Sequence, residues 1–163
     1  MPLAAPLPVG GSAVLLREAV RDDVRAIVDL LADDQLGAAR DGATDDDGLR
    51  PYLDAFEAID TDPAHLLLVA VDDGQVVATM QLSFLPGLAR RGALRAQIEA
   101  VRVGRGHRGG GLGAAMLTWA VDESRRRGCA LVQLTTDKAR TDAHRFYERL
   151  GFVASHEGLK LAL

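Results

Sequence analysis

The segment around which the fold is organised reads Arg108-Gly109-Gly110-Gly111-Leu112-Gly113. It follows an extended apolar segment at residues 93–103 and leads into an amphipathic pattern. Glycine lacks a Cβ, so the backbone N–H groups of such a loop can approach a ligand oxygen closely. The N-terminus of the following helix offers further unpaired N–H groups and favours an anion. The order strand, glycine loop, helix therefore predicts a phosphate-binding loop.

The spacing of this loop differs from that of the two common nucleotide-binding loops. No Gly-Lys-Ser/Thr sequence closes it as in a P-loop, and no acidic ribose ligand follows at the distance typical of a Rossmann unit. The loop instead resembles the Arg/Gln-x-x-Gly-x-Gly/Ala motif of the GNAT N-acetyltransferase superfamily, which cradles the pyrophosphate of acetyl-CoA. The segments at residues 97–103 and 143–152 extend this resemblance on both sides of the loop.

The resemblance implies an α/β (α+β) fold with a mixed central sheet of about six to seven strands, a bulged strand at the cofactor site and about four helices. It also implies an enzyme that transfers the acetyl group of acetyl-CoA directly to a primary amine of a small molecule or peptide, without a metal. The implied cofactor-binding residues are Val101, Val103, Arg108, Gly109, Gly110, Gly111, Leu112, Gly113, Ala114, Arg140, Ala143 and His144.

Periodicity and turn signals place the other elements. Residues 1–12, with three prolines and two glycines, are expected to be a flexible leader before a single domain at residues 13–163. Strands are expected at residues 13–17, 65–71, 75–85, 93–103, 130–135, 152–155 and 159–163, the last two as a closing pair. Helices are expected at residues 22–36, 49–60, 112–127 and 141–150. Asp73-Gly74 predicts a tight hairpin, because this pair suits positive φ.

The strand at residues 93–103 carries a defect in its alternation. The apolar positions are first Leu94, Ala96, Ile98 and Ala100, and then Val101 and Val103. A slip of one residue indicates a β-bulge, which bends a strand and frees backbone groups. A strand buried on both faces near its end gives the same pattern. In the GNAT fold a bulged strand here diverges from its parallel neighbour and binds the pantetheine arm, which favours the bulge.

Tyr147 and Glu99 are the candidate catalytic residues. A phenol can protonate a leaving thiolate, and GNAT enzymes commonly place a tyrosine at this point of the last helix, so Tyr147 is the candidate acid. Packing on the cofactor or the core is its alternative role. Glu99 is the candidate base, directly or through a water, because a carboxylate on an inner strand is costly to bury. Alternatively, it lines the wet face of an antiparallel sheet.

Four further residues have less specific roles. Arg140 stands where GNAT chains often carry an asparagine that hydrogen-bonds the pantetheine; arginine has no acceptor, and a CoA phosphate is its alternative partner. His107 is expected to face solvent, and His144 to touch the cofactor. Cys129 lies beside an apolar run, so a buried thiol is favoured over a nucleophile.

Composition limits the class of protein and its partners. The chain has 163 residues, 48% apolar and 26% charged, with a net charge of -4, which indicates one globular domain and no nucleic-acid partner. The single cysteine and the lack of a signal-peptide pattern favour the cytoplasm. The longest apolar runs, such as residues 66–71, are too short to cross a membrane.

Charge is distributed unevenly along the chain. Residues 22–62 contain thirteen Asp/Glu and three Arg, a balance of -10, whereas the remainder carries +6. In GNAT folds the first two helices and their loop wall the acceptor site, so this field would attract a cationic amine. A solvated acidic surface is the alternative.

Two other functions remain as alternatives to the enzyme: a non-catalytic acyl-CoA-sensing module and a pure interaction domain. A homodimer is the alternative to a monomer.

Overall fold

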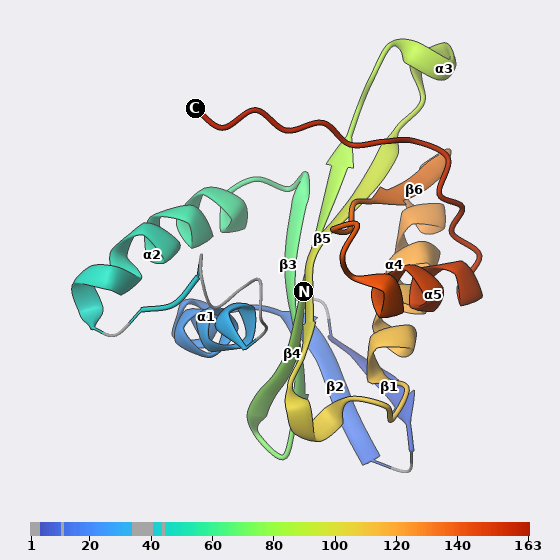
Figure 1. Cartoon of the computed structure of the whole chain (residues 1–163). Coiled ribbons are helices and arrows are strands. Elements are labelled where there is room, and N and C mark those ends of the chain that lie inside the picture. Colours follow the sequence, from blue (N-terminus) through green and yellow to red (C-terminus); the bar gives the residue numbers. More distant parts are fainter. Residues whose placement is uncertain (1–3, 11, 34–40, 44) are drawn as a thin grey trace.

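A computed structural model of the chain describes residues 4–10, 12–33, 41–43 and 45–163. Its centre is a six-stranded mixed sheet whose strands lie in chain order (Figure 1). The strands are β1 (Ala4–Val9), β2 (Ser12–Glu18), β3 (His65–Asp72), β4 (Gln75–Leu85), β5 (Arg95–Val103) and β6 (Leu131–Leu134). Neighbours are antiparallel except β5 and β6, which are parallel. This architecture confirms the predicted α/β class.

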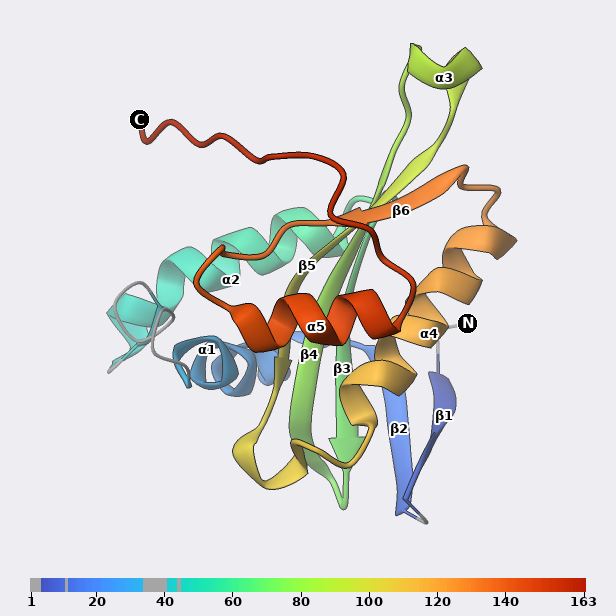
Figure 2. The same ribbon diagram turned by 45° about the vertical axis from the view of Figure 1, so that its right-hand side comes forward.

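Helices cover both faces of the sheet, with α1 and α2 on one side and α4 and α5 on the other (Figure 1, Figure 2). The helices of the described residues are α1 (Val24–Ala32), α2 (Asp46–Asp60), α3 (Ala89–Gly92), α4 (Leu112–Arg126) and α5 (Thr141–Arg149), with 3-10 turns at Arg21–Asp23 and Arg105–His107. The four longer helices were predicted, although residues 34–36 of the first lie outside the described residues. The unpredicted α3 is a short turn between β4 and β5, in which Arg90 and Arg91 have positive φ.

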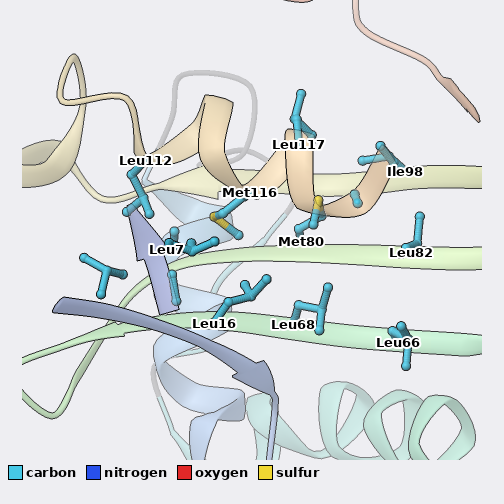
Figure 3. Packing of buried hydrophobic residues seen from close by; sticks show 14 of the residues in the cluster. Leu7, Leu16, Leu66, Leu68, Met80, Leu82, Ile98, Leu112, Met116 and Leu117 are labelled. Atoms are coloured by element: carbon cyan, nitrogen blue, oxygen red, sulfur yellow. The ribbon is translucent and has the colours of Figure 1, made fainter. Parts of the chain in front are cut away.

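Two hydrophobic clusters hold the layers together. The larger one lies between the sheet and α4, and its fully buried members include Leu16, Leu68, Met80, Leu82, Ile98, Met116 and Leu117 (Figure 3). On the other face, Val28 of α1 and Phe56 of α2 pack near Val69 of β3. Each large apolar side chain buried in this way contributes about 1.5–3 kcal/mol.

The predicted defect in β5 is a β-bulge. Gln81 pairs with Glu99 and Thr79 pairs with Arg102, so one residue of β4 lies opposite two residues of β5. Ala100 has a φ of 53°, in the left-handed region that alanine rarely adopts. The extra residue bends β5 beside its parallel neighbour.

The parallel pairing of β5 with β6 is short, because β6 ends at Leu134. The two strands pair only from Arg95↔Leu131 to Ile98↔Leu134, whereas β5 continues to Val103. The connecting helix α4 ends at the predicted cap: Gly128 has a φ of 77°, and its N–H donates to Arg125 O at 3.0 Å. The side of β5 that faces β6 therefore has no strand partner beyond Ile98 among the described residues.

The expected leader contains a strand. The segment Ala4–Val9 pairs with β2 along its whole length, from Ala4↔Arg17 to Val9↔Ser12. Pro6 and Pro8 concealed this strand, because proline cannot donate to a ladder and normally excludes a strand assignment. An edge strand tolerates proline, since one side of it has no neighbour to receive a donor. The expectation of an irregular leader is therefore wrong for this segment.

The expected closing pair of strands is also wrong. Residues 152–163 are described, and they contain no strand. Their large apolar side chains, Val153, Leu159, Leu161 and Leu163, are exposed. Alternating apolar residues predict a strand only where a neighbour can pair with it, and no strand among the described residues pairs with this segment.

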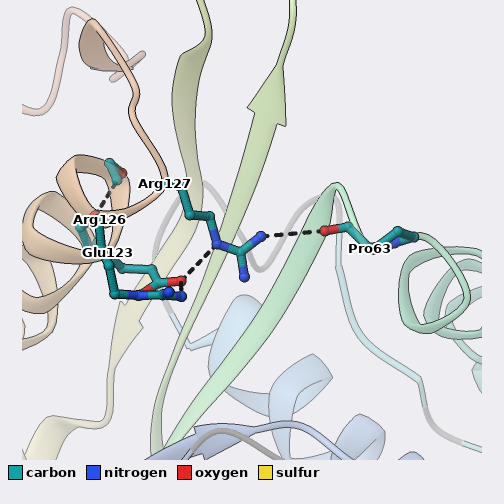
Figure 4. Close-up of polar contacts among 6 residues, drawn as sticks. Pro63, Glu123, Arg126 and Arg127 are labelled. Atoms are coloured by element: carbon teal, nitrogen blue, oxygen red, sulfur yellow. Dashed lines mark hydrogen bonds and ion pairs between the residues drawn. The ribbon is translucent and has the colours of Figure 1, made fainter.

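A charged network fixes the C-terminal end of α4 (Figure 4). Glu123 is only 6% exposed and accepts hydrogen bonds from Arg126, at 2.6 and 2.7 Å, and from Arg127 at 2.7 Å. Arg127 also donates to Pro63 O at 3.4 Å, and its guanidinium carbon lies 4.1 Å from the centre of the Phe84 ring. Arg127 therefore connects α4 to the sheet, and Glu123 holds both Arg126 and Arg127 at the end of the helix.

Glu123→Gln is expected to lower the free energy of unfolding by about 1.5–3 kcal/mol, because the charge-assisted hydrogen bonds are lost. The hydrogen bond from Arg126 lowers the pKa of Glu123 although burial opposes it. The stabilisation is therefore present above the ordinary glutamate pKa of about 4.3 and disappears as the pH falls through the lower folded-state pKa. Urea unfolding of parent and variant at neutral and acidic pH measures both effects.

Asp122→Asn is the matched control for this prediction. Asp122 pairs with Arg125 at 2.8 Å on the exposed side of the same helix. Such a surface pair contributes about 0–1 kcal/mol, so the control should retain nearly all of the stability. Equal losses for the two variants at neutral pH would contradict a structural role for the buried carboxylate.

Candidate active site

The glycine loop leads into α4 as predicted. Gly111 is the N-cap residue with a φ of 88°, and Gly109 has a φ of 79°, values that glycine adopts without steric cost. No side chain caps the helix, so the N–H groups of its first turn, at Leu112, Gly113 and Ala114, lack an intrahelical partner. Leu112 is buried and anchors this turn in the core. The loop thus presents donors at the positive end of a 15-residue helix.

Arg108 braces the loop. Its Nε donates to Val103 O at 2.8 Å, and its Nη2 lies 3.2 Å from Asp33 Oδ2. Arg105 binds the other carboxylate oxygen of Asp33 at 2.7 Å. The two arginines therefore join the loop to the end of β5 and to the residue that follows α1.

Three elements converge beside the loop: the end of β5, the start of α4, and α5. A Cβ on Gly113 would lie 3.5 Å from Phe146 Cζ and 3.6 Å from Val103 Cγ2. Val101, Val103 and Tyr147 all pack at the edge of the larger core. Past Ile98, β5 has β4 on one side and no strand on the other among the described residues. The bulged segment of β5 therefore has one side without a described strand partner, and this side lies beyond the end of β6.

Tyr147 lies half-buried at this junction. Its ring packs on Phe146 and Phe152, with centroid distances of 5.3 and 5.9 Å. Burial raises the pKa of the Tyr147 phenol, and the positive charges of Arg102 and Arg140 partly offset this rise. The phenol is therefore protonated at neutral pH and can act as a proton donor.

The start of α5 holds the remaining residues assigned to the cofactor. Arg140 is the half-buried N-cap residue, and Ala143 is half-buried in the first turn. The His144 Nε2 atom lies 3.0 Å from Asp137 O, so the ring donates to the loop before α5. All three residues precede Tyr147 on the same helix by at most two turns.

His107 differs from its expected setting, whereas Cys129 agrees with its expected role. His107 was expected to face solvent, but its Nε2 lies 3.1 Å from Asp72 Oδ2 at the β3–β4 hairpin. Cys129 is half-buried, and burial raises the pKa of its thiol. A raised thiol pKa lowers the thiolate fraction, which agrees with the assignment of Cys129 as a packing residue.

Glu99 lies on the other face of the sheet, toward α1 and α2. It pairs with Gln81, and residues directly opposite each other in a ladder share a face. The Glu99 side chain is exposed, so the burial cost that suggested a function is absent. Glu99 lies next to Gln81, which lines a cavity, and this position supports a role of Glu99 as the base.

The cavity of about 170 Å³ lies between α1, α2 and the sheet. Val28 and Leu31 of α1 and Tyr52 and Phe56 of α2 form much of its wall, and Ala100 of the bulge contributes to its lining. The family resemblance placed the acceptor site between these helices, but the sequence identified none of these residues. In the sequence, these residues form only an apolar helix face. Residues that simply pack against the sheet give the same pattern.

Metal and membrane sites are not found in the described part of the chain. No group of three His, Cys, Asp or Glu side chains there could hold a metal ion. Within the same residues, no helix combines the length and apolar character that crossing a bilayer requires.

The chain belongs to the GNAT acetyltransferase family. Residues 25–152, well over half of the chain, match the family model described as the acetyltransferase (GNAT) family. This match confirms the resemblance read from the glycine loop and its flanking segments, and with it the acyltransferase class. GNAT enzymes use acetyl-CoA.

Individual relatives agree with this assignment. The chain is 34% identical to the aminoalkylphosphonate N-acetyltransferase of Salmonella typhimurium over 105 residues, which cover 64% of this chain and 68% of the relative. It is 34% identical to the glucosamine 6-phosphate N-acetyltransferase of Trypanosoma brucei brucei over 90 residues, 55% of this chain but only 59% of the relative. The crystal structure of a transcriptional regulator from Bacillus halodurans C-125 superposes with a TM-score of 0.88 and 44% identity, covering 92% of this chain and 99% of that one.

Proposed function

We propose that this chain is an acetyl-CoA-dependent N-acetyltransferase that acts on a primary amine of a small molecule or a peptide. The observation that carries the proposal is the convergence of the uncapped start of α4, the bulge in β5 and the protonated Tyr147. Both curated relatives are named N-acetyltransferases of small amine compounds, which supports the reaction type. We also propose a cytoplasmic location, because the single cysteine of the chain, Cys129, cannot form an internal disulfide.

The cofactor is proposed to lie along the glycine loop and the side of β5 that has no described strand partner beyond Ile98. The free N–H groups at the start of α4 suit the pyrophosphate, and the space above Gly111 is open, since a Cβ there would meet no atom within 4 Å. The bulged segment at Val101 and Val103 offers backbone groups to the pantetheine arm. The other proposed contacts are Arg108, Gly109, Gly110, Leu112, Gly113, Ala114, Arg140, Ala143 and His144. Acetyl-CoA, when bound, supplies the acetyl thioester.

Tyr147 and Glu99 are proposed to move the two protons of the reaction. Tyr147 Oη donates its proton to the thiolate as the C–S bond breaks. Glu99, directly or through a water, removes a proton from the amine nitrogen as the new C–N bond forms. The two groups approach β5 from opposite faces, so the phenol serves the leaving group and the carboxylate serves the acceptor.

A non-catalytic acyl-CoA-sensing module is the second candidate function. One observation favours it: the structure that is 44% identical to this chain is named a transcriptional regulator. Thiol release from acetyl-CoA over a broad panel of amines separates the two functions. The enzyme is expected to release CoA only when an amine is present and to yield an equal amount of N-acetyl product by mass spectrometry. Binding of acetyl-CoA without release by any amine would favour the sensor.

A homodimer is proposed as the state in solution. The exposed apolar side chains of residues 152–163 support it, because a second copy could cover Val153, Leu159 and Leu161. Multi-angle light scattering gives the molar mass directly, and a monomer mass over the micromolar range would exclude the dimer.

Gly111→Val is expected to weaken acetyl-CoA binding by about tenfold or more, because its side chain would occupy the space above the first-turn donors. Gly128→Val is the matched control. Both glycines have positive φ, and at neither would a Cβ meet an atom within 4 Å, so the two substitutions impose similar backbone strain. Only Gly111 is at the proposed pyrophosphate site. Calorimetry that finds equal dissociation constants for the two variants would contradict the role of the loop.

Tyr147→Phe is expected to lower kcat by about ten- to a thousandfold, the range for loss of a positioned proton donor. The phenyl ring keeps the packing on Phe146 and Phe152, so the dissociation constant for acetyl-CoA should not change. Rapid-quench and steady-state measurements with a good amine acceptor test both statements. An unchanged rate of the chemical step would remove the acid role and leave Tyr147 as a packing residue.

A further inference from the structure

We propose that the acceptor is a primary amine carried on an uncharged apolar group, such as an aryl-alkyl or branched alkyl chain, and that this group occupies the cavity between α1, α2 and the sheet. This inference rests on the proposed N-acetyltransferase function and specifies its acceptor. It separates this chain from its two curated relatives, which are named for a phosphonate and a phosphate compound.

The size of the cavity defines the group it can hold. Its volume is about 170 Å³. An apolar cavity of about 150 Å³ in another protein binds a benzene molecule, so a ring or a branched chain of similar size fits here. The lining extends from the buried Val28 to the exposed Ala55 of α2, so a ligand can enter from solvent. Protein interiors are close-packed, which makes an open apolar space of this size unusual for a simple helix–sheet contact.

The cavity ends where the reaction is proposed to occur. Ala100, the bulged residue that precedes the proposed pantetheine contact at Val101, is part of its lining. Gln81 also contributes to the lining, and its ladder partner Glu99 lies on the same face. An amine attached to a group inside the cavity would therefore have its nitrogen near the bulge and near the carboxylate proposed as base.

The chemistry of the lining disfavours an anionic acceptor. All of the described residues that line the cavity are uncharged, and most are apolar. The nearby arginines of the described helices are already paired: Arg25 with Asp46 at 3.3 Å, and Arg50 with Asp54 at 2.9 Å. A phosphonate or phosphate placed here would lose water and would meet no cationic side chain among the described lining residues, which is strongly unfavourable. The excess of Asp and Glu between residues 22 and 62 adds repulsion.

A competition among defined amines tests this inference. The value of kcat/KM for 2-phenylethylamine and 3-methylbutylamine is expected to exceed that for 2-aminoethylphosphonate by about tenfold or more, the scale on which apolar pockets discriminate. Preference for the phosphonate would overturn the inference while leaving the N-acetyltransferase function intact.

Ala55→Trp provides the site-specific test, because the indole would fill the open end of the cavity. It is expected to lower kcat/KM for 2-phenylethylamine by about tenfold, with little effect on methylamine, which is too small to need the cavity. Ala58→Trp is the control, since Ala58 is exposed on the same helix and does not line the cavity. Equal effects of the two substitutions would overturn the assignment.

A binding measurement keeps this inference separable from catalysis. Titration of 2-phenylethanol, which resembles the amine but lacks its nitrogen, is expected to shift the methyl NMR signals of Val28 and Leu31 in the parent and not in Ala55→Trp. If these shifts occur and no amine is acetylated, the cavity assignment stands and the enzymatic function fails. If the signals do not move at millimolar ligand, the cavity assignment is wrong.

Discussion

One extra residue in β5 determines how the two faces of the sheet relate to each other. Ala100 holds a φ of 53°, a conformation that costs a non-glycine residue about 1–3 kcal/mol and persists only where the surroundings impose it. Packing on both sides supplies that constraint, since Ile98 is buried against the α4 side and Ala100 itself lines the cavity on the α1 and α2 side. The bulge lies beyond the last residue of β5 that pairs with β6, in the part of the strand that leads to the glycine loop.

The loop is held next to the end of β5 by contacts at both ends of α4. At its start, Leu112 is buried in the core, and Arg108 connects the preceding turn to Val103 and Asp33. At its end, Glu123 and Arg127 connect the helix to Pro63 and Phe84. A helix fixed in this way can present its unpaired N–H groups in one orientation without a ligand, which lowers the entropic cost of binding.

Local chemistry explains which parts of the structure were predictable. Asp73 and Gly74 have φ values of 46° and 76°, as expected for a tight hairpin, and the phase slip at Ala100 and Val101 located the bulge. Such features are set by a few neighbouring residues. The pairing of segments that lie far apart in the sequence is not set by neighbouring residues. Pro6 and Pro8 concealed β1, and the alternation of Leu159, Leu161 and Leu163 predicted a strand although no described strand pairs with it. The cavity escaped prediction because apolar residues of α1 and α2 give the same pattern whether they pack or line a cavity. The sequence also predicted a buried Glu99, whereas its side chain is exposed in the structure.

The proposed function depends most on acetyl-CoA binding to the first turn of α4 and the bulged segment of β5. Backbone amide chemical shifts in a two-dimensional ¹⁵N NMR titration report this contact residue by residue. Acetyl-CoA is expected to move the amide signals of Leu112, Gly113 and Ala114 together with that of Val101, while signals of the β1–β2 hairpin stay in place. Saturable binding that leaves these four amides unchanged would contradict the proposed site.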